Sequence, residues 1–424
     1  MSNKKQSPWW WVPTLYFAEG IPYFIVNVIS VTMFKRLGMS NGDLAMYTSL
    51  LYLPWVIKPL WSPFVDVIRT KRWWILVMQW LCTAGFAALA LSVSPNVFGL
   101  TLVIFYVIAF ASATHDIAAD GFYMLALEEK QQAAFVGIRS TFYRIASVFG
   151  QGVIVVLAGI LEERLGAIPR AWSLTLLGSA VLFGLVSLWH WRFLPKVETD
   201  RSENAPSATP ARTGAEIFRE FGQAWVTFFQ KPGVWLAIVF MLLYRLPEAL
   251  SVKMLTPFLL DPAEAGGLGL STAQSGLVYG TVGVIALTVG GILGGLFAAR
   301  QGLRKSLWPM SMSLALPCAV YLFLAAAQPA QLWIIYLCVA VDQFGYGFGF
   351  TAYMIYMMHF SEGPFKTSHY AICTAFMALS MMIPGLFAGW MQEALGYVGF
   401  FITVMICCLA TVFVTFFVRQ RCSS

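Results

Sequence analysis

The chain has 424 residues, 59% of them hydrophobic and 11% charged, and its mean hydropathy is +0.72. These values are typical of an integral membrane protein and exclude a soluble globular domain of ordinary composition. The seven cysteines form no C-x-x-C pair, so the sequence predicts neither a disulfide framework nor a metal site. The net charge of +7 comes largely from basic residues between apolar segments, so it does not indicate a nucleic-acid partner.

Twelve apolar segments follow one another along the chain, each near the length of about 20 residues that a helix needs to span a bilayer. They lie at residues 10–34, 43–65, 73–94, 98–127, 133–161, 171–193, 234–260, 273–298, 306–327, 331–358, 367–392 and 397–418. The one long polar stretch separates the sixth segment from the seventh. After it, apolar residues recur at helical spacing over 217–229, which predicts an amphipathic helix on the membrane surface.

The sequence therefore predicts an all-α membrane protein in three parts. Residues 1–194 are expected to form one six-helix bundle, 195–232 a cytoplasmic linker with the amphipathic helix, and 233–424 a second six-helix bundle. With the N-terminus in the cytoplasm, cytoplasmic segments carry eighteen Lys and Arg residues and the opposite segments carry four. The positive-inside rule then predicts that both termini are cytoplasmic.

The two predicted bundles share sequence at a nearly constant offset. The stretch from Ala158 to Gly166 returns 230 residues later from Ala388 to Gly396, and Gly38-Met39-Ser40 returns at an offset of 231 as Gly269-Leu270-Ser271. Two six-helix halves in parallel repeat resemble the plan of major facilitator superfamily transporters, whose halves rock about a central site.

A second pattern agrees with that resemblance. The loop at 294–305 resembles the cytoplasmic glycine and basic loop of the superfamily, and 61–72 is its counterpart in the first half. Charges in such loops hold the cytoplasmic helix ends together in one state and release them in the other. They make Asp66, Arg72, Arg300 and Arg304 gating candidates, although charges that only fix the topology are the alternative interpretation.

Four stretches in the first half of the chain resemble a narrower family, the AmpG-type muropeptide permeases. The acetyl-CoA transporters are also related to this family. The four stretches are LPWVIKPLWSPFVD at 53–66, AEGIP at 18–22, HDIAADG at 115–121 and Tyr143-Arg144. The resemblance implies proton-driven import of anhydromuropeptides, which are wall fragments of a disaccharide and a short peptide, across the inner membrane of a Gram-negative bacterium. The chain departs from the family in lacking extra helices and in having Glu19 and His115 where uncharged residues are common.

Ionisable side chains interrupt the fourth apolar segment. Asp116, Asp120 and Tyr123 are spaced to share one helix face. Because an ionisable group costs several kcal/mol in lipid, that face is expected to line a polar path. Arg139 and Arg144 of the fifth segment lie at comparable depth, which predicts an ionic lock, tested most simply as a pair of Asp120 with Arg144. The alternative is direct proton carriage by Asp116 or Asp120.

Other polar groups lie in candidate cavity helices, including Lys58, which is expected to join the same network. Arg245 is predicted either to bind a substrate carboxylate or phosphate or to pair with Glu248. A buried carboxyl group takes up a proton more readily than one in water, so Glu19 and Asp342 are proton-site candidates, with a neutral hydrogen-bonding role as the alternative. The remaining substrate-site candidates are an amide and three aromatic rings: Asn27, Tyr16, Tyr123 and Tyr353.

The motifs favour a transporter over an enzyme. His115 and Asp120 match the H-x-x-x-x-D spacing of some acyltransferases, but a five-residue step on a helix turns them to different faces. No P-loop is present, so an ion gradient is the expected driving force. We expect a monomeric proton-coupled transporter in the lipid bilayer, without a cofactor, that imports anhydromuropeptides or another anionic conjugate such as a siderophore or acetyl-CoA. A membrane sensor without flux is the non-transport alternative.

Overall fold

The computed structural model describes residues 7–197 and 214–421, and these residues form helices and connecting loops without a β-strand. Within these ranges, ten helices are long and apolar enough to cross a membrane. The all-α membrane architecture is thus confirmed. The exact count of twelve spanning helices is not confirmed, for two reasons given below.

Residues 7–197 contain nine α-helices. Their bounds are α1 (Val12–Phe24), α2 (Ser30–Arg36), α3 (Asn41–Leu50), α4 (Leu53–Val67), α5 (Lys71–Leu91), α6 (Phe98–Ala126), α7 (Glu129–Val148), α8 (Val155–Leu165) and α9 (Ile168–Phe193). Two π-helical stretches, Ile25–Ile29 and Phe149–Ile154, join α1 to α2 and α7 to α8. Each of these pairs therefore crosses as one continuous rod.

The second half begins with a helix set apart from the rest, α10 (Gly214–Phe229). The others are α11 (Val234–Leu243), α12 (Leu246–Leu260), α13 (Thr272–Ser275), α14 (Val284–Gln301), α15 (Leu303–Ala315), α16 (Ala319–Ala327), α17 (Leu332–Phe360) and α18 (Lys366–Arg421), with a π-helical stretch at Gly276–Gly283 between α13 and α14.

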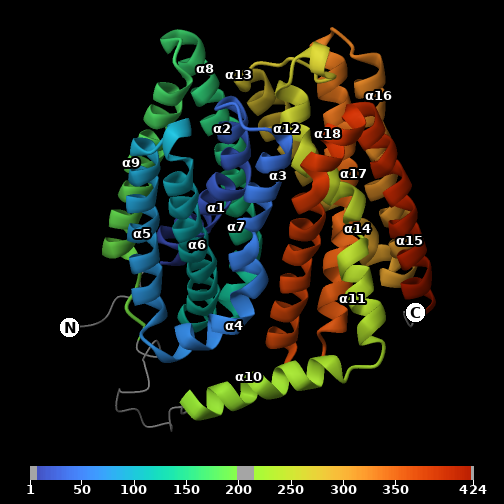
Figure 1. The fold of residues 1–424 in the computed structure, drawn as a ribbon. Helices are drawn as coiled ribbons and strands as arrows, with labels where there is room; N and C mark the ends of the chain where they lie inside the picture. Colours follow the sequence, from blue (N-terminus) through green and yellow to red (C-terminus); the bar gives the residue numbers. More distant parts are fainter. Residues whose placement is uncertain (1–6, 198–213, 422–424) are drawn as a thin grey trace.

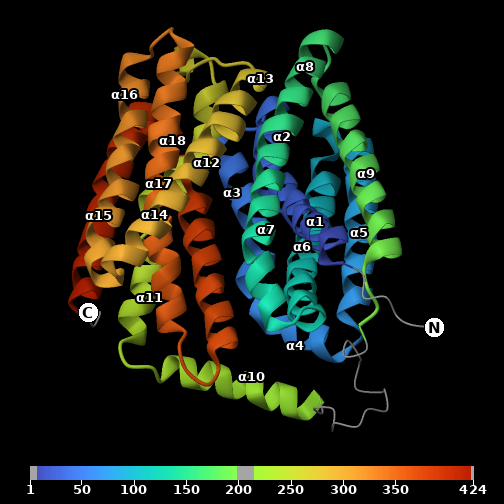
Figure 2. The same ribbon diagram turned by 180° about the vertical axis from the view of Figure 1, so that it is seen from behind.

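The helices gather into two bundles that stand side by side, α1–α9 in one and α11–α18 in the other (Figure 1). Helix α10 lies across one end of both bundles, which we call the α10 end, and the view from behind agrees (Figure 2). Its Phe218 ring packs against Phe64 of α4 at 5.1 Å, and its Thr227 hydroxyl lies 3.1 Å from His369 Nε2 of α18. The opposite end, formed by the connections 37–40, 166–167 and 261–271, is the far end.

Three predicted spans contain or adjoin a break in the helix. The span predicted at 43–65 is broken at Leu51 and Tyr52 into α3 and α4, because Pro54 cannot donate the hydrogen bond that would continue α3. The spans predicted at 367–392 and 397–418 both lie in α18, where non-helical backbone at Gly396 (φ 68°, ψ 173°) makes a kink between two helical parts. A left-handed φ at this bend is accessible to glycine without strain.

Candidate functional site

Asp116 of α6 lies in a polar group inside the first bundle. Its Oδ2 atom accepts a hydrogen bond from Trp55 Nε1 at 3.0 Å and lies 3.8 Å from Lys58 Nζ. Both partners come from α4, and the α4 break places them opposite α6. The Asp116 Oδ1 atom is buried and has no hydrogen-bond partner. The predicted inclusion of Lys58 in the α6 network is thus present in the geometry.

Asp120, one turn further along α6, carries the strongest ion pair of this group. Arg139 NH2 of α7 lies 2.8 Å from its Oδ1 atom, and the Tyr16 hydroxyl of α1 donates to the same oxygen at 3.2 Å. The Arg139 guanidinium also lies over the rings of Tyr16 at 4.5 Å and Tyr123 at 5.6 Å. The Asp120 and Arg139 side chains are 42% and 33% exposed, so water reaches a charged pair on otherwise apolar helices.

The predicted pairing of Asp120 with Arg144 is wrong, because Arg139 occupies that place. Helices α6 and α7 are joined by a short connection, and of the two arginines Arg139 lies nearer to it. Arg144 lies five residues, or about 7.5 Å, further along α7 than Arg139. Its guanidinium instead approaches α14 of the second bundle, where a Cβ on Gly291 would lie 3.3 Å from Arg144 NH2.

Glu19 of α1 is the third carboxyl group of this region. It is buried, and its Oε2 atom has no hydrogen-bond partner among the described residues. Because it follows Tyr16 by three residues on one helix, it lies on the face that Tyr16 turns toward Asp120. The group of Glu19, Asp116, Asp120, Lys58 and Arg139, which we call the acid–base cluster, therefore holds three acids and two bases.

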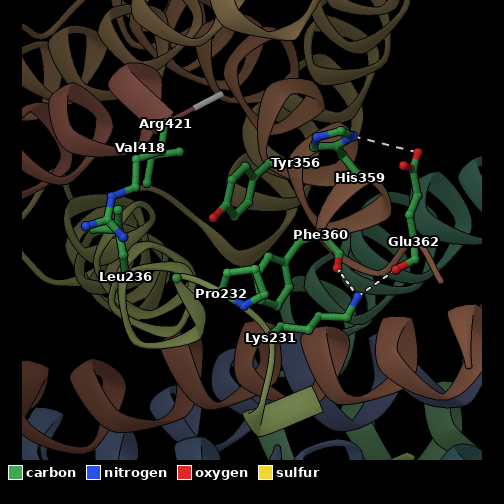
Figure 3. A pocket seen from close by; sticks show the side chains of 10 residues that line it. Lys231, Pro232, Leu236, Tyr356, His359, Phe360, Glu362, Val418 and Arg421 are labelled. Atoms are coloured by element: carbon green, nitrogen blue, oxygen red, sulfur yellow. Dashed lines mark hydrogen bonds and ion pairs between the residues drawn. The ribbon is translucent and has the colours of Figure 1, made fainter. Parts of the chain in front are cut away.

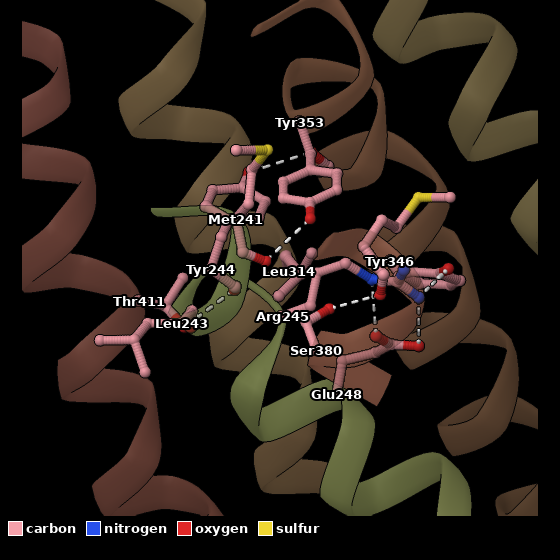
Figure 4. Close-up of polar contacts among 12 residues, drawn as sticks. Met241, Leu243, Tyr244, Arg245, Glu248, Leu314, Tyr346, Tyr353, Ser380 and Thr411 are labelled. Carbon is pink, nitrogen blue, oxygen red and sulfur yellow. Dashed lines mark hydrogen bonds and ion pairs between the residues drawn. The ribbon is translucent and has the colours of Figure 1, made fainter. Parts of the chain in front are cut away.

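The second bundle contains a compact ion pair at the break between α11 and α12 (Figure 4). Arg245 Nε and NH2 lie 3.0 and 3.4 Å from the two Glu248 oxygens, and NH2 donates to the Tyr346 hydroxyl at 2.8 Å. Its guanidinium lies 4.7 Å from the centre of the Phe350 ring. Both charged groups are buried, so Glu248 already neutralises the charge of Arg245.

The other substrate-site candidates have their polar atoms engaged within the protein to different degrees. The Tyr353 hydroxyl donates to the Met241 carbonyl at 2.8 Å, as Figure 4 shows, and the Tyr123 hydroxyl donates to the Gln132 carbonyl at 2.5 Å. Asn27 Nδ2 donates to the Tyr23 carbonyl at 3.1 Å, while its buried Oδ1 has no partner. Of these three residues, only Asn27 has a buried polar side-chain atom without a partner among the described residues.

Asp342 of α17 is held by neutral donors rather than by a base. Its Oδ2 atom accepts hydrogen bonds from the Tyr321 hydroxyl at 2.7 Å and from Gln343 Nε2 at 3.0 Å. It is buried in the second bundle, away from the α6 acids. These contacts fit either a protonated or a charged carboxyl group.

The gating candidates at the α10 end do not meet across the two bundles among the described side chains. Arg72 donates from Nε and NH2 to the carbonyls of Leu194 and Trp191 at 3.0 and 2.9 Å, which ties it to the end of α9. Arg300 and Arg304 are exposed, and neither forms an ion pair within the part of the chain that the structure describes. The Asp66 side chain lies outside the described part of the chain.

Sequence reasoning missed the polar contacts that join the bundles at the far end. Lys35 Nζ pairs with Asp261 Oδ1 at 2.6 Å. Glu162 of α8, buried and bound by Arg36 Nε at 3.0 Å, accepts a hydrogen bond from the Thr272 hydroxyl of α13 at 2.6 Å. At a second place where the two bundles meet, Asn41 Nδ2 of α3 donates to Gln392 Oε1 of α18 at 2.7 Å. We call these contacts the far-end lock.

The internal repeat is what builds this lock. Glu162 and Gln392 are equivalent at an offset of 230, and Asn41 and Thr272 at an offset of 231, so the same side-chain contact occurs twice. The repeated glycines lie beside it: a Cβ on Gly159 would overlap Ala273, and one on Gly389 would overlap the Asn41 carbonyl. Small residues at these positions let the helices of opposite bundles approach closely. The repeat was visible in the sequence, but its role at the interface was not.

A cavity of about 390 Å³ lies where α10 connects to α11 (Figure 3). Lys231, Leu236, Tyr356, Phe360 and Arg421 are among the residues that line it. The Lys231 ammonium donates to the carbonyls of Phe360 and Glu362 at 2.5 and 2.8 Å. Burial lowers the pKa of Lys231. None of the predicted proton or substrate residues lines this cavity.

Known proteins resemble this chain along nearly its whole length. The anhydromuropeptide permease of Escherichia coli K12 is 26% identical over 396 residues, which cover 92% of this chain and 75% of that protein. The putative transporter AmpG 4 of Rickettsia conorii is 22% identical over 422 residues, covering 96% and 95% of the two chains. An uncharacterized protein of Haemophilus influenzae is 24% identical over 399 residues, covering 91% and 88%.

Solved structures show the same fold at lower identity. A bacterial homolog of the human lysosomal transporter Spinster, inward-facing and unoccupied, has a TM-score of 0.71 at 16% identity and covers 99% of this chain and 98% of its own. The nucleoside transporter NupG has a TM-score of 0.68 at 14% identity, with 97% and 98% covered. The family model of the Major Facilitator Superfamily matches residues 14–362. The chain is therefore a multi-pass membrane transporter that belongs to the major facilitator superfamily.

Proposed function

We propose that this transporter imports anhydromuropeptide-type sugar–peptide conjugates together with protons, by alternating access between two bundles. The observation that carries the coupling is the acid–base cluster. It places three carboxyl groups and two bases on apolar helices, and Asp120 is 42% exposed there. Such groups are rare within a membrane unless they serve a substrate or proton pathway.

Glu19 is the proton site that this arrangement favours. Asp120 is paired with Arg139, and Asp116 lies near Lys58, whereas the buried Glu19 forms no ion pair with a base among the described residues. Each of the other two acids lies near a base, so ionisation of the third carboxyl group would cost much free energy. Binding of a proton removes that cost. We infer that Glu19 binds the transported proton and that the two pairs adjust its access to water.

The far-end lock supports alternating access. Its cross-bundle contacts are hydrogen bonds and one ion pair, which break without leaving a buried charge in lipid when water enters the far end. We propose that the far end faces the periplasm and that the α10 end, with both termini, faces the cytoplasm. The loop charges support this orientation, because the segments predicted to be cytoplasmic carry eighteen basic residues in the sequence and the opposite segments carry four.

We propose that the second bundle supplies the wall of the transport path that contacts the sugars of the cargo. The Arg245–Glu248 pair and the rings of Tyr346 and Phe350 form a polar and aromatic surface at the break of the seventh span. Broken helices at mid-membrane are where transporters place their substrate groups. The name of the Escherichia coli relative, anhydromuropeptide permease, supports this cargo over other anionic conjugates.

Uptake into right-side-out membrane vesicles tests the cargo. Vesicles containing the chain should accumulate labelled anhydromuropeptide, and excess unlabelled anhydromuropeptide should compete at least tenfold better than acetyl-CoA or a ferric siderophore. Vesicles with an Asp120→Asn variant serve as the inactive control. If acetyl-CoA or the siderophore competed better than anhydromuropeptide, the cargo would be reassigned, and the conclusion that the protein is a transporter would stand.

A further inference from the structure

Lys253 of α12 is a buried basic residue that belongs to neither the acid–base cluster nor the far-end lock. Its side chain is 6% exposed. The ammonium contacts two groups, the Thr48 hydroxyl of α3 at 3.1 Å and the face of the Tyr52 ring at 5.5 Å from its centre. No carboxylate forms an ion pair with it in the part of the chain that the structure describes. This distinguishes Lys253 from Arg245, which has a buried acid beside it.

An ammonium group in this position is expensive to keep. One hydroxyl and one aromatic face replace only part of its hydration, and burying a charge without an opposite charge costs several kcal/mol. Methionine or leucine would fill the same space between α12 and α3 without that cost. A lysine held under these conditions indicates an anionic partner in another state of the protein, in which water and that partner stabilise the charge.

The position of Lys253 indicates the state of the transporter in which that partner binds. Thr48 belongs to the first bundle and Lys253 to the second, so their contact crosses the interface. On α3, Thr48 lies seven residues, or two turns, below Asn41 of the far-end lock. The side chain also passes Gly385 of α18, where a Cβ would lie 3.2 Å from Lys253 Cε. Separation of the bundles at the far end therefore uncovers the ammonium group directly beneath the lock.

We propose that Lys253 binds a carboxylate of the incoming cargo when the far end is open, and exchanges it for Thr48 and the Tyr52 ring when the empty transporter closes. This inference rests on the proposed function in requiring that the far end opens. It transfers the anion-binding role from Arg245, whose charge is already neutralised, to Lys253. A carboxylate is the chemistry that a free ammonium recognises as a point charge, without demanding the planar geometry of an arginine pair.

The local charge can be measured without any cargo. In a variant with all native cysteines replaced by serine or alanine, Thr48→Cys serves as reporter, with Ser49→Cys as a second reporter if the first does not fold. An anionic and a cationic methanethiosulfonate reagent are applied from outside to right-side-out vesicles. A unit charge at about 4 Å in water changes the local concentration of each reagent about fivefold. The anionic reagent should therefore react roughly 25 times faster, relative to the rates of both with a free thiol.

Substitutions at Lys253 decide the assignment. Lys253→Met should reduce the preference to within twofold, Lys253→Arg should keep it, and the matched control Lys305→Met, at an exposed lysine of the α10 end, should leave it unchanged. A preference that survives Lys253→Met, or reporters that react with neither reagent, would overturn the proposal. Failure of proton-driven uptake alone would not alter these rates, so the two hypotheses fail separately.

Cargo chemistry supplies the second measurement. Anhydromuropeptide with free peptide carboxylates is compared with the same compound amidated at those groups. In Lys253→Met the KM for the carboxylate form should rise about tenfold, while the KM for the amide should change less than twofold. An equal rise for both forms would show that Lys253 supports the fold rather than the carboxylate, and would overturn the proposal.

Discussion

The lock makes a defined prediction for Thr272→Val. The substitution keeps the size and shape of a side chain that is 1% exposed and removes one donor, the hydroxyl that reaches Glu162 Oε2 at 2.6 Å. Arg36 and Trp172, which also bind Glu162, belong to the same bundle and remain bound when the far end opens. The lost contact is thus confined to the closed state.

The size of the effect follows from the chemistry of that contact. A hydrogen bond to a charged group contributes about 1.5–3 kcal/mol net. Loss of this amount from the closed state alone shifts the ratio of closed to open far ends by roughly 10- to 150-fold. Only one of the two repeated seams is changed, so the protein is expected to insert and fold normally.

The assay is pulsed electron paramagnetic resonance with spin labels on two exposed far-end residues, Arg164→Cys in the first bundle and Glu264→Cys in the second. Thr272→Val should move population from the short to the long distance. Thr288→Val is the matched control, because its hydroxyl bonds only to Val284 of its own helix. An unchanged distance distribution in a folded Thr272→Val protein would refute the idea that this contact holds the bundles together.

Three further predictions concern the acids, the glycines and the buried pair. Asp120→Arg combined with Arg139→Asp should recover at least a third of the vesicle uptake lost in either single variant, and no recovery would argue against a functional pair. Gly389→Val should hold the far end open in the same distance measurement, because its side chain overlaps the α3 backbone, whereas Gly178→Val, with no neighbour within 4 Å, should not. Arg245→Ala should destabilise the detergent-purified protein by about 3–5 kcal/mol, since it leaves a buried carboxylate unpaired. A normal thermal melt for that variant would contradict the structural role of the pair.

Hydropathy predicted most of this architecture because apolar length is a direct physical requirement of a bilayer. It failed at Pro54, where backbone chemistry breaks an apolar run, whereas the gap predicted between 392 and 397 does contain the non-helical Gly396. A hydropathy average does not register a missing amide hydrogen. Pro54 viewed as a helix breaker would have placed that discontinuity.

The site was predictable in its residue types and less so in its pairings. The acids of α6 were found because charge within an apolar segment is itself the signal. Their partner was misassigned because the sequence does not give the relative height of α6 and α7, which selects Arg139 over Arg144. Lys253, like Asp116, is an ionisable residue within an apolar segment, but it was not selected as a candidate. The far-end lock joins residues more than 100 positions apart in the sequence. Its only signal in the sequence was the repeat that makes Glu162 and Gln392 equivalent.

The central claim is that cargo entry brings protons with it through the acid–base cluster. The most direct test uses purified protein in proteoliposomes that contain a pH-sensitive dye, without an imposed gradient. Addition of anhydromuropeptide outside should acidify the interior, a protonophore should abolish the signal, and Glu19→Gln should take up labelled cargo to equilibrium without acidification. Cargo uptake by the unmodified protein with no change in interior pH would contradict the account.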